Sequence, residues 1–160
     1  MTTRSRVITC SDAASRGERE DLSGPAVRGI LADLGFAPDR IVVVADDVDA
    51  IESAITEAIA DGVQLVVTTG GTGIAPRDVT PEATLRVCDR ILPGFGEAMR
   101  ATSKMGPLSR ALAATRGTAL VVNLPGSAGG AAECLRAVAH LIPHALELLS
   151  GDRVERHPQP

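Results

Sequence analysis

The sequence contains no tryptophan and no tyrosine, and its only phenylalanines are Phe36 and Phe95. Proteins that hold single-stranded nucleic acid stack bases on aromatic side chains, so this composition nearly excludes that function. The net charge is −4 and no basic run occurs, which argues against a surface that binds nucleic-acid phosphates. We therefore expect no nucleic-acid partner, and we expect any bound purine to rest on aliphatic side chains and backbone.

Cysteine is scarce, and long apolar runs are missing. Cys10, Cys88 and Cys134 lie far apart and form no Cys-x-x-Cys pair, which favours small buried thiols in a reducing compartment. No stretch reaches the ~18 apolar residues of a membrane helix, and no apolar segment of signal length follows the basic start. We predict a soluble, cytoplasmic protein without a membrane partner.

Length and composition fit one compact domain. The 160 residues are 44% hydrophobic and 22% charged, as in an ordinary globular protein. A chain of this length buries roughly two-thirds of the surface that it exposes when unfolded. We predict a single domain over residues 1–160, with a core from about 6 to 151 and a flexible tail from 152 to 160.

Short runs rich in β-branched residues alternate with segments in which apolar residues recur at helical spacing. The runs predict strands over residues 7–10, 41–45, 64–68 and 118–123. The spacing predicts helices over residues 23–34, 51–61, 81–91, from 94 to about 103, and 131–150, with a polar, mobile stretch over 104–117. Buried strands separated by helices predict a three-layer α/β fold, in which an open, mainly parallel sheet has helices on both faces.

The most informative segment is a glycine-rich loop from Thr68 to Pro81, which follows the third predicted strand. Its glycines and threonines let the backbone approach an anion closely and offer N–H and hydroxyl donors. It is not a phosphate-binding P-loop, because no lysine is near, nor a dinucleotide fingerprint, because Pro76 stands at the third glycine position. We expect it to bind an anionic ligand, and we expect a side chain at Gly71 to weaken that binding while leaving the fold intact.

Polar residues directly follow each of the four predicted strands. These strand ends are Ser11 with Asp12, Asp46 with Asp47, the loop Gly70–Gly73, and the segment Leu124–Ser127. The carboxyl ends of parallel strands share one edge of an open sheet, and ligands bind at that edge. The four ends therefore predict a single site built from four loops.

Six pieces of the chain keep an order and spacing that chance would not give. They are Ser11–Gly17 in the pattern Ser-Asp-x-x-Ser-x-Gly, Asp21–Gly24, Thr68–Pro81, Pro93–Gly96, Leu108–Arg110 and Asn123–Ser127. In these pieces the chain resembles the molybdopterin-binding family of molybdenum-cofactor synthesis, which includes molybdopterin adenylyltransferases and the related biosynthesis protein B. The resemblance spans about residues 6–151.

The resemblance implies Mg²⁺-dependent transfer of AMP from ATP to molybdopterin, which gives adenylyl-molybdopterin and pyrophosphate. It also implies a homotrimer and transient contact with other proteins of cofactor synthesis. A non-catalytic molybdopterin-binding or carrier protein of the same pathway is the alternative. An unrelated nucleotide or sugar-phosphate enzyme on the same architecture is a third hypothesis, because fold alone does not specify function.

By the same resemblance the two functionally important aspartates are Asp46 and Asp78, which we predict to be both the catalytic residues and the metal ligands. Mg²⁺ usually takes one or two protein carboxylates together with phosphates and water, so the pair suits it. The attacking phosphate is already an anion at neutral pH, so positioning and electrostatic stabilisation would carry the reaction. The predicted substrate-binding residues are Ser11, Asp12, Gly70, Gly71, Thr72, Gly73, Arg77, Ser109, Arg110, Asn123, Pro125, Gly126 and Ser127.

Four of the charged residues near the predicted site also have ordinary structural interpretations. Asp46 or Asp47 could cap the helix that follows, and Asp47 is the better candidate of the two. Asp12 could form a local turn with its own backbone, and Arg77 could be a solvated charge. The sequence leaves these alternatives open.

Overall fold

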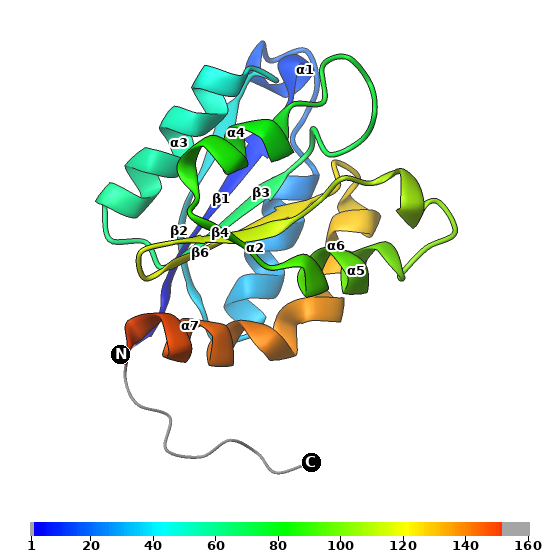
Figure 1. Ribbon diagram of the computed structural model, residues 1–160. Coiled ribbons are helices and arrows are strands. Elements are labelled where there is room, and N and C mark those ends of the chain that lie inside the picture. The colour runs from blue at the N-terminus through cyan, green and yellow to red at the C-terminus, as the bar shows by residue number, and fades with distance from the viewer. Residues whose placement is uncertain (1, 152–160) are drawn as a thin grey trace.

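Strands and helices alternate along residues 2–151, the part of the chain that the computed structural model describes (Figure 1). The strands are β1 (Arg4–Cys10), β2 (Ala37–Val44), β3 (Leu65–Thr69), β4 (Arg90–Ile91), β5 (Ala113–Arg116) and β6 (Ala119–Leu124). The α-helices are α1 (Asp12–Ser15), α2 (Ser23–Asp33), α3 (Val48–Ala60), α4 (Thr80–Val87), α5 (Pro93–Arg100), α6 (Ala128–Val138) and α7 (Ile142–Ser150). Two 3₁₀ turns, η1 (Gly106–Leu108) and η2 (Ala139–Leu141), complete the described part. The predicted tail over residues 152–160 lies outside it.

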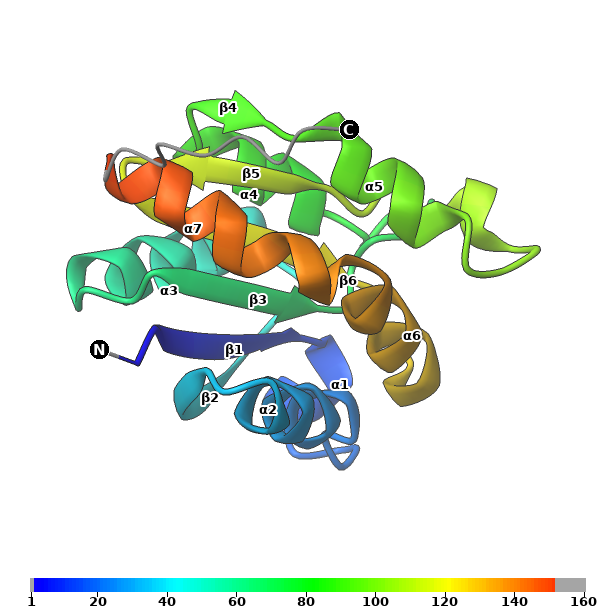
Figure 2. The same ribbon diagram turned by 90° about the horizontal axis from the view of Figure 1, so that it is seen from below.

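The strands form one six-stranded sheet in the order β2-β1-β3-β6-β5-β4. The first four strands in this order run parallel, whereas β5 is antiparallel to both of its neighbours. Helices cover both faces, so the three-layer α/β architecture with a mainly parallel sheet is confirmed (Figures 1 and 2). Within residues 2–151, no helix has the length and apolar character needed to cross a membrane.

Several of the predicted boundaries are wrong: β1, β2 and α3 start three or four residues earlier than predicted, and three other segments differ more. Residues 113–116 were expected in a mobile stretch, but they form β5, because a two-residue turn with Gly117 at φ +54° folds them back onto β6. The helix expected over residues 81–91 ends at Val87, and β4 follows it. The last helix starts at Ala128 and is interrupted by η2, and α7 restarts with Pro143, which has no N–H to continue the earlier helix.

The core has one layer on each face of the sheet. In one layer α2, α5, α6 and α7 pack on side chains such as Val7 and Leu120, and in the other α3 and α4 pack on Ile8 and Val66. All three cysteines are free; Cys10 and Cys134 are buried, as predicted for small apolar side chains, and Cys88 is half-buried.

The order of the strands places a crevice at one end of the sheet. Strand β1 is followed by β2 on one side, through α2, and β3 lies on its other side, reached through α3. The first long helix after β1, α2, lies on one face of the sheet, and the helix that follows β3, α4, lies with α3 on the other face. The chain therefore leaves the carboxyl ends of these two neighbouring strands in opposite directions, and a crevice lies between the two ends. Figure 2 shows both strands ending beside α1 and α6.

Candidate active site

A cavity of about 520 Å³ occupies this crevice. Each of the four predicted strand ends contributes to its wall. The contributing residues that the sequence singled out are Ser11, Asp46, Gly70, Gly71, Asp78, Gly126 and Ser127. The four polar ends therefore meet in one place, as the parallel topology predicts.

The glycine loop passes so close to β1 and α4 that two of its positions exclude side chains. Gly70 and Gly71 have φ values of +92° and +67°, in the left-handed region. A Cβ on Gly70 would lie 2.3 Å from the carbonyl oxygen of Cys10, and one on Gly71 would lie 2.3 Å from Oγ1 of Thr80. A side chain at Gly71 should therefore lower stability as well as weaken binding, because the Thr80 Oγ1 that it would displace donates a 2.8 Å hydrogen bond to the Gly70 carbonyl.

Asp12 and Asp46 hold the ends of β1 and β2 together. The Asp12 N–H donates to Oδ2 of Asp46 at 2.9 Å, and the Asp46 N–H donates to Oδ1 of Asp12 at 3.0 Å. Arg77 adds a two-pronged ion pair, with Nε and Nη2 each 2.9 Å from the Asp12 carboxylate. Asp12 thus forms a tertiary contact rather than a local turn, and Arg77 is exposed but paired.

The two aspartates differ in their electrostatic surroundings. The hydrogen-bonded Arg77 lowers the pKa of Asp12 below its ordinary value. Burial raises the pKa of Asp46, and the negative charges of Asp12 and Asp78 raise it further. A cation placed beside Asp46 would relieve this repulsion, so the site favours binding a positive ion there.

Asp46 and Asp78 both approach the glycines of the loop, and the charge of Asp78 acts on Asp46. Oδ1 of Asp46 is 3.3 Å from the position of a Cβ on Gly71, and Oδ2 of Asp78 is 2.8 Å from the position of a Cβ on Gly73. Asp78 also accepts a hydrogen bond from the Ala75 N–H at 2.9 Å. Residues 2–151 contain no group of three or more acidic, histidine or cysteine side chains that could hold a metal. Two carboxylates are nonetheless enough for Mg²⁺ when phosphates supply further oxygens.

Asp47, not Asp46, caps the helix after β2. Its carboxylate accepts the Ala50 N–H at 2.9 Å, at the start of α3. This is the ordinary structural role that the sequence favoured for Asp47. The carboxylate of Asp46 is left to face the cavity.

Eight of the predicted substrate-binding residues do not line the cavity. They are Asp12, Thr72, Gly73, Arg77, Ser109, Arg110, Asn123 and Pro125. Asn123 is fully buried beneath the loop, where its amide nitrogen donates to the hydroxyls of Thr68 and Thr84 at 3.0 Å. Ser109 accepts the Ala111 N–H with its hydroxyl. Asn123 and Ser109 thus form bonds within the protein, and the substrate-binding roles of these eight residues stay predictions.

The link between α1 and α2 also forms part of the wall, and the sequence assigned no role to it. It contributes Arg19, Glu20, Asp21, Leu22 and Ser23. The carboxylate of Asp21 accepts bonds from Oγ1 of Thr9 at 2.8 Å and from the Gly24 N–H at 2.9 Å. The pattern Asp21–Gly24 was visible in the sequence, but nothing in it showed that this segment folds back onto β1.

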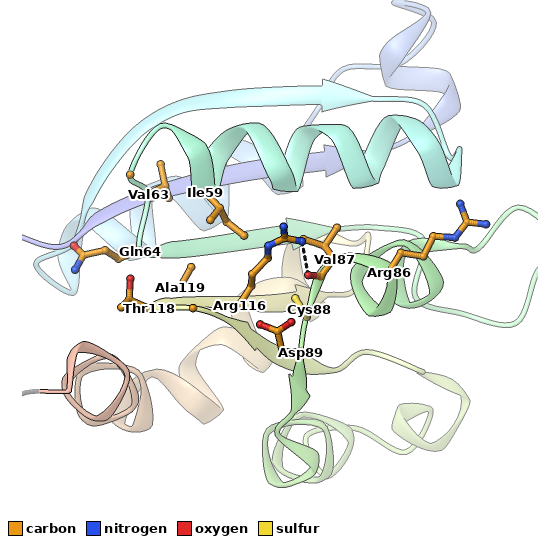
Figure 3. Close-up of a pocket in the computed structure, with 12 residues that line it drawn as sticks. Ile59, Val63, Gln64, Arg86, Val87, Cys88, Asp89, Arg116, Thr118 and Ala119 are labelled. Carbon is orange, nitrogen blue, oxygen red and sulfur yellow. Dashed lines mark hydrogen bonds between the residues drawn. The ribbon is translucent and has the colours of Figure 1, made fainter.

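A second cavity, of about 650 Å³, lies near the amino ends of β3 and β6 (Figure 3). Its wall includes the start of β6 at Ala119, the end of α4 and the side chain of Arg116. In Figure 3 the Arg116 guanidinium reaches across to the carbonyl oxygen of Val87, to which it donates at 2.8 Å. None of the predicted site residues lines this cavity, whereas several of them line the crevice at the other end of the sheet.

Comparisons with known proteins agree on one family. The sequence profile of the family described as "Probable molybdopterin binding domain" matches residues 6–144. A molybdopterin adenylyltransferase of Helicobacter pylori is 46% identical over 157 residues, which cover 93% of this chain and 89% of that protein. The structure of the molybdopterin biosynthesis enzyme MoaB of Thermus thermophilus has a TM-score of 0.89 at 42% identity and covers 94% of this chain and 98% of its own. The Mog protein of Mycobacterium ulcerans has a TM-score of 0.88 at 35% identity, with 95% and 99% covered.

The first prediction concerns the close approach at Gly71. Gly71→Ala places a methyl group against Thr80 at a left-handed backbone position, so we expect the free energy of unfolding to fall by about 2 kcal/mol. Urea denaturation measures this change. Gly29→Ala is the matched control, because a Cβ on Gly29 in α2 meets nothing within 4 Å and should cause no loss of stability. Equal stability of the two variants would refute the contact.

The second prediction uses the raised pKa of Asp46. Ionised Asp46 destabilises the folded protein, since folding disfavours its charged form, whereas below its unfolded pKa of about 3.9 the carboxyl is neutral in both states. Asp46→Asn removes this cost and keeps an oxygen for the Asp12 N–H. We expect the stability of the variant relative to wild type to rise as the pH increases from about 4 to 7. Denaturation at both pH values in metal-free buffer measures the unfolding free energies. The prediction is contradicted if Asp46→Asn is less stable relative to wild type at pH 7 than at pH 4.

Proposed function

The chain belongs to the molybdopterin-binding family, and we propose that it is a nucleotidyltransferase that moves AMP from ATP to molybdopterin and releases pyrophosphate. The observation that supports this most directly is the pair of carboxylates, Asp46 and Asp78, which line the cavity next to the glycine loop. The resemblance to molybdopterin adenylyltransferases along 93% of the chain points to the same reaction.

We propose that Mg²⁺ assists this reaction and that Asp46 and Asp78 would hold it. The donor set fits the ion, because two carboxylates at the edge of a phosphate site match the ligands that Mg²⁺ takes in proteins. When bound, the ion neutralises charge on the phosphates of ATP. The raised pKa of Asp46 supports the assignment, since this carboxylate lacks a cationic side chain of its own to offset the charges of Asp12 and Asp78.

Backbone N–H groups and short polar side chains would bind the phosphates directly. The left-handed φ values of Gly70 and Gly71 bring the loop backbone to the cavity wall, where the Gly71 N–H would donate to an anion, whereas the Gly70 N–H donates to the Leu124 carbonyl at 3.0 Å. Beside this loop Ser127 caps α6, so N–H groups at the amino end of that helix would supply further donors. These neutral donors would orient the two phosphates, and in-line positioning would replace a general base.

A non-catalytic binding protein would not need the carboxylate pair. Neutral donors hold an anion well, whereas a carboxylate beside a phosphate repels it unless a cation lies between them. No feature of the described residues favours the carrier hypothesis. The enzyme hypothesis, in contrast, gives both carboxylates a role.

Replacement of either metal ligand should affect turnover far more than pterin binding. We expect Asp46→Asn and Asp78→Asn to lower the rate of AMP transfer by ~10²-fold or more, the usual effect of losing one electrostatic stabiliser. Molybdopterin affinity should change little or rise, because the neutral donors remain. Mass spectrometry of adenylyl-molybdopterin, formed from molybdopterin and Mg-ATP, measures the rate.

Asp49→Asn is the matched control, because Asp49 is an exposed carboxylate on α3 outside the cavity and should leave turnover unchanged. If the Asp46 and Asp78 variants lost pterin binding and turnover in equal proportion, the two side chains would be structural. A wild-type protein that binds molybdopterin without forming the adenylylated product would establish the carrier hypothesis instead.

We further propose that the protein is a homotrimer in the cytoplasm, in transient contact with other proteins of cofactor synthesis. The trimer rests on the family resemblance, and several exposed apolar side chains, such as Ile91 at the sheet edge, offer surface for an interface. Light scattering at micromolar concentration should give three times the mass of the chain. A monomeric mass would refute the trimer.

A further inference from the structure

The side chain of Arg110 is bound to the glycine loop from behind. Nε of Arg110 donates to the Gly73 carbonyl at 2.7 Å, and Nη2 donates to the Asp78 carbonyl, also at 2.7 Å. The Arg110 backbone N–H donates to the Thr72 carbonyl at 2.7 Å as well. Nη1 forms an ion pair with Glu82, in the first turn of α4. One residue thus bonds both ends of the segment 72–78 and the helix that follows it.

This segment carries Asp78, and its internal bonds are few. The Asp78 side chain accepts the Ala75 N–H, and the Asp78 N–H donates to the Ala75 carbonyl, both at 2.9 Å. These two bonds close a small ring from Ala75 to Asp78 but do not tie the ring to the rest of the protein. Two arginines make that connection: Arg77, on the exposed side of the ring, pairs with Asp12, and Arg110 contacts the carbonyl group of Gly73, just before the ring, and that of Asp78, at its end. The fixed fork of an arginine is well suited to hold two acceptors at a set spacing.

We propose that Arg110 is a positioning residue that fixes the Asp78 carboxylate beside Asp46. The inference rests on the proposed function, in which these two carboxylates hold Mg²⁺. All three guanidinium nitrogens of Arg110 already donate to the protein, and the side chain does not line the cavity, so Arg110 does not itself bind phosphate. It acts on the reaction through the backbone of Asp78.

The test compares Arg110→Gln with Arg116→Gln. The control substitution is matched, because Arg116 also donates to a backbone carbonyl at the end of an element, that of Val87, but near the other cavity. Hydrogen exchange of the protein alone should speed up over residues 72–78 in Arg110→Gln and not in Arg116→Gln. The Mg²⁺ concentration for half-maximal AMP transfer should rise about tenfold, the effect of losing one or two hydrogen bonds from a charged donor. KM for molybdopterin should stay near that of wild type, and excess Mg²⁺ should restore much of kcat.

Several outcomes would overturn the proposal. A lower kcat with unchanged loop exchange and unchanged Mg²⁺ dependence would make Arg110 a phosphate-binding residue. Faster exchange throughout the sheet in Arg110→Gln would make Arg110 a general structural residue. Glu82→Gln, which removes only the ion pair with Arg110, is the milder variant for that case, and it should speed up exchange over residues 72–78 alone. Arg110→Lys, which keeps the charge but not the fork, should behave more like Arg110→Gln than like wild type, and full activity in this variant would count against the geometry.

The exchange measurement separates this proposal from the proposed function. Hydrogen exchange needs neither ATP nor molybdopterin, so it reports on the bonds between Arg110 and the segment 72–78 even in a protein without turnover. Absence of AMP transfer in wild type would refute the enzyme while leaving the exchange difference to decide whether Arg110 holds the loop. If wild type transfers AMP but Arg110→Gln exchanges at the wild-type rate over residues 72–78, the enzyme is supported and the positioning role of Arg110 is refuted.

Discussion

At the carboxyl ends of β1, β3 and β6 the backbone of three strands comes so close that glycine is required. A Cβ on Gly70 would lie 2.3 Å from the Cys10 carbonyl oxygen, and one on Gly126 would lie 3.3 Å from the Cα of Gly70. Where side chains are excluded, the wall of the cavity is formed by backbone. The Gly70 N–H donates to the Leu124 carbonyl and fixes the loop against β6, and the loops that carry the aspartates are arranged around this contact.

Electrostatics impose a second constraint on the same space. Asp12 is hydrogen-bonded to Arg77, whereas Asp46 is partly buried, accepts one backbone N–H, and feels the charges of two other aspartates more strongly than that of Arg77. The ligand-free protein thus keeps an unfavourable charge distribution, which is typical of a functional site because such strain has no structural benefit. A polyanion alone would increase the repulsion, and a polyanion bound together with a divalent cation would remove it. The charge pattern favours joint binding of both.

Much of this arrangement could be predicted from the sequence, because it depends on local patterns. The four parallel strands follow from runs of apolar β-branched residues, and the convergence of their ends follows from parallel topology alone. Strand β5 could not be found in this way, since Ala113 and Ala114 carry no strand preference and are recruited by pairing with β6. The roles of Arg110 and Asn123 were also beyond the sequence. Their motifs were visible, but the direction of each side chain is set by contacts with residues more than 25 positions away.

Cys10 lies in the wall of the cavity, at the end of β1, next to the two proposed metal ligands and the glycine loop. Burial raises the pKa of its thiol to about 12, and the charge of Asp46 contributes in the same direction. The sulfur is therefore protonated at physiological pH. The thiolate is the reactive form of cysteine, so a thiol kept neutral by burial is a poor nucleophile and reacts slowly with oxidants. The fold thus keeps a cysteine in the cavity wall without adding a reactive thiolate to the site.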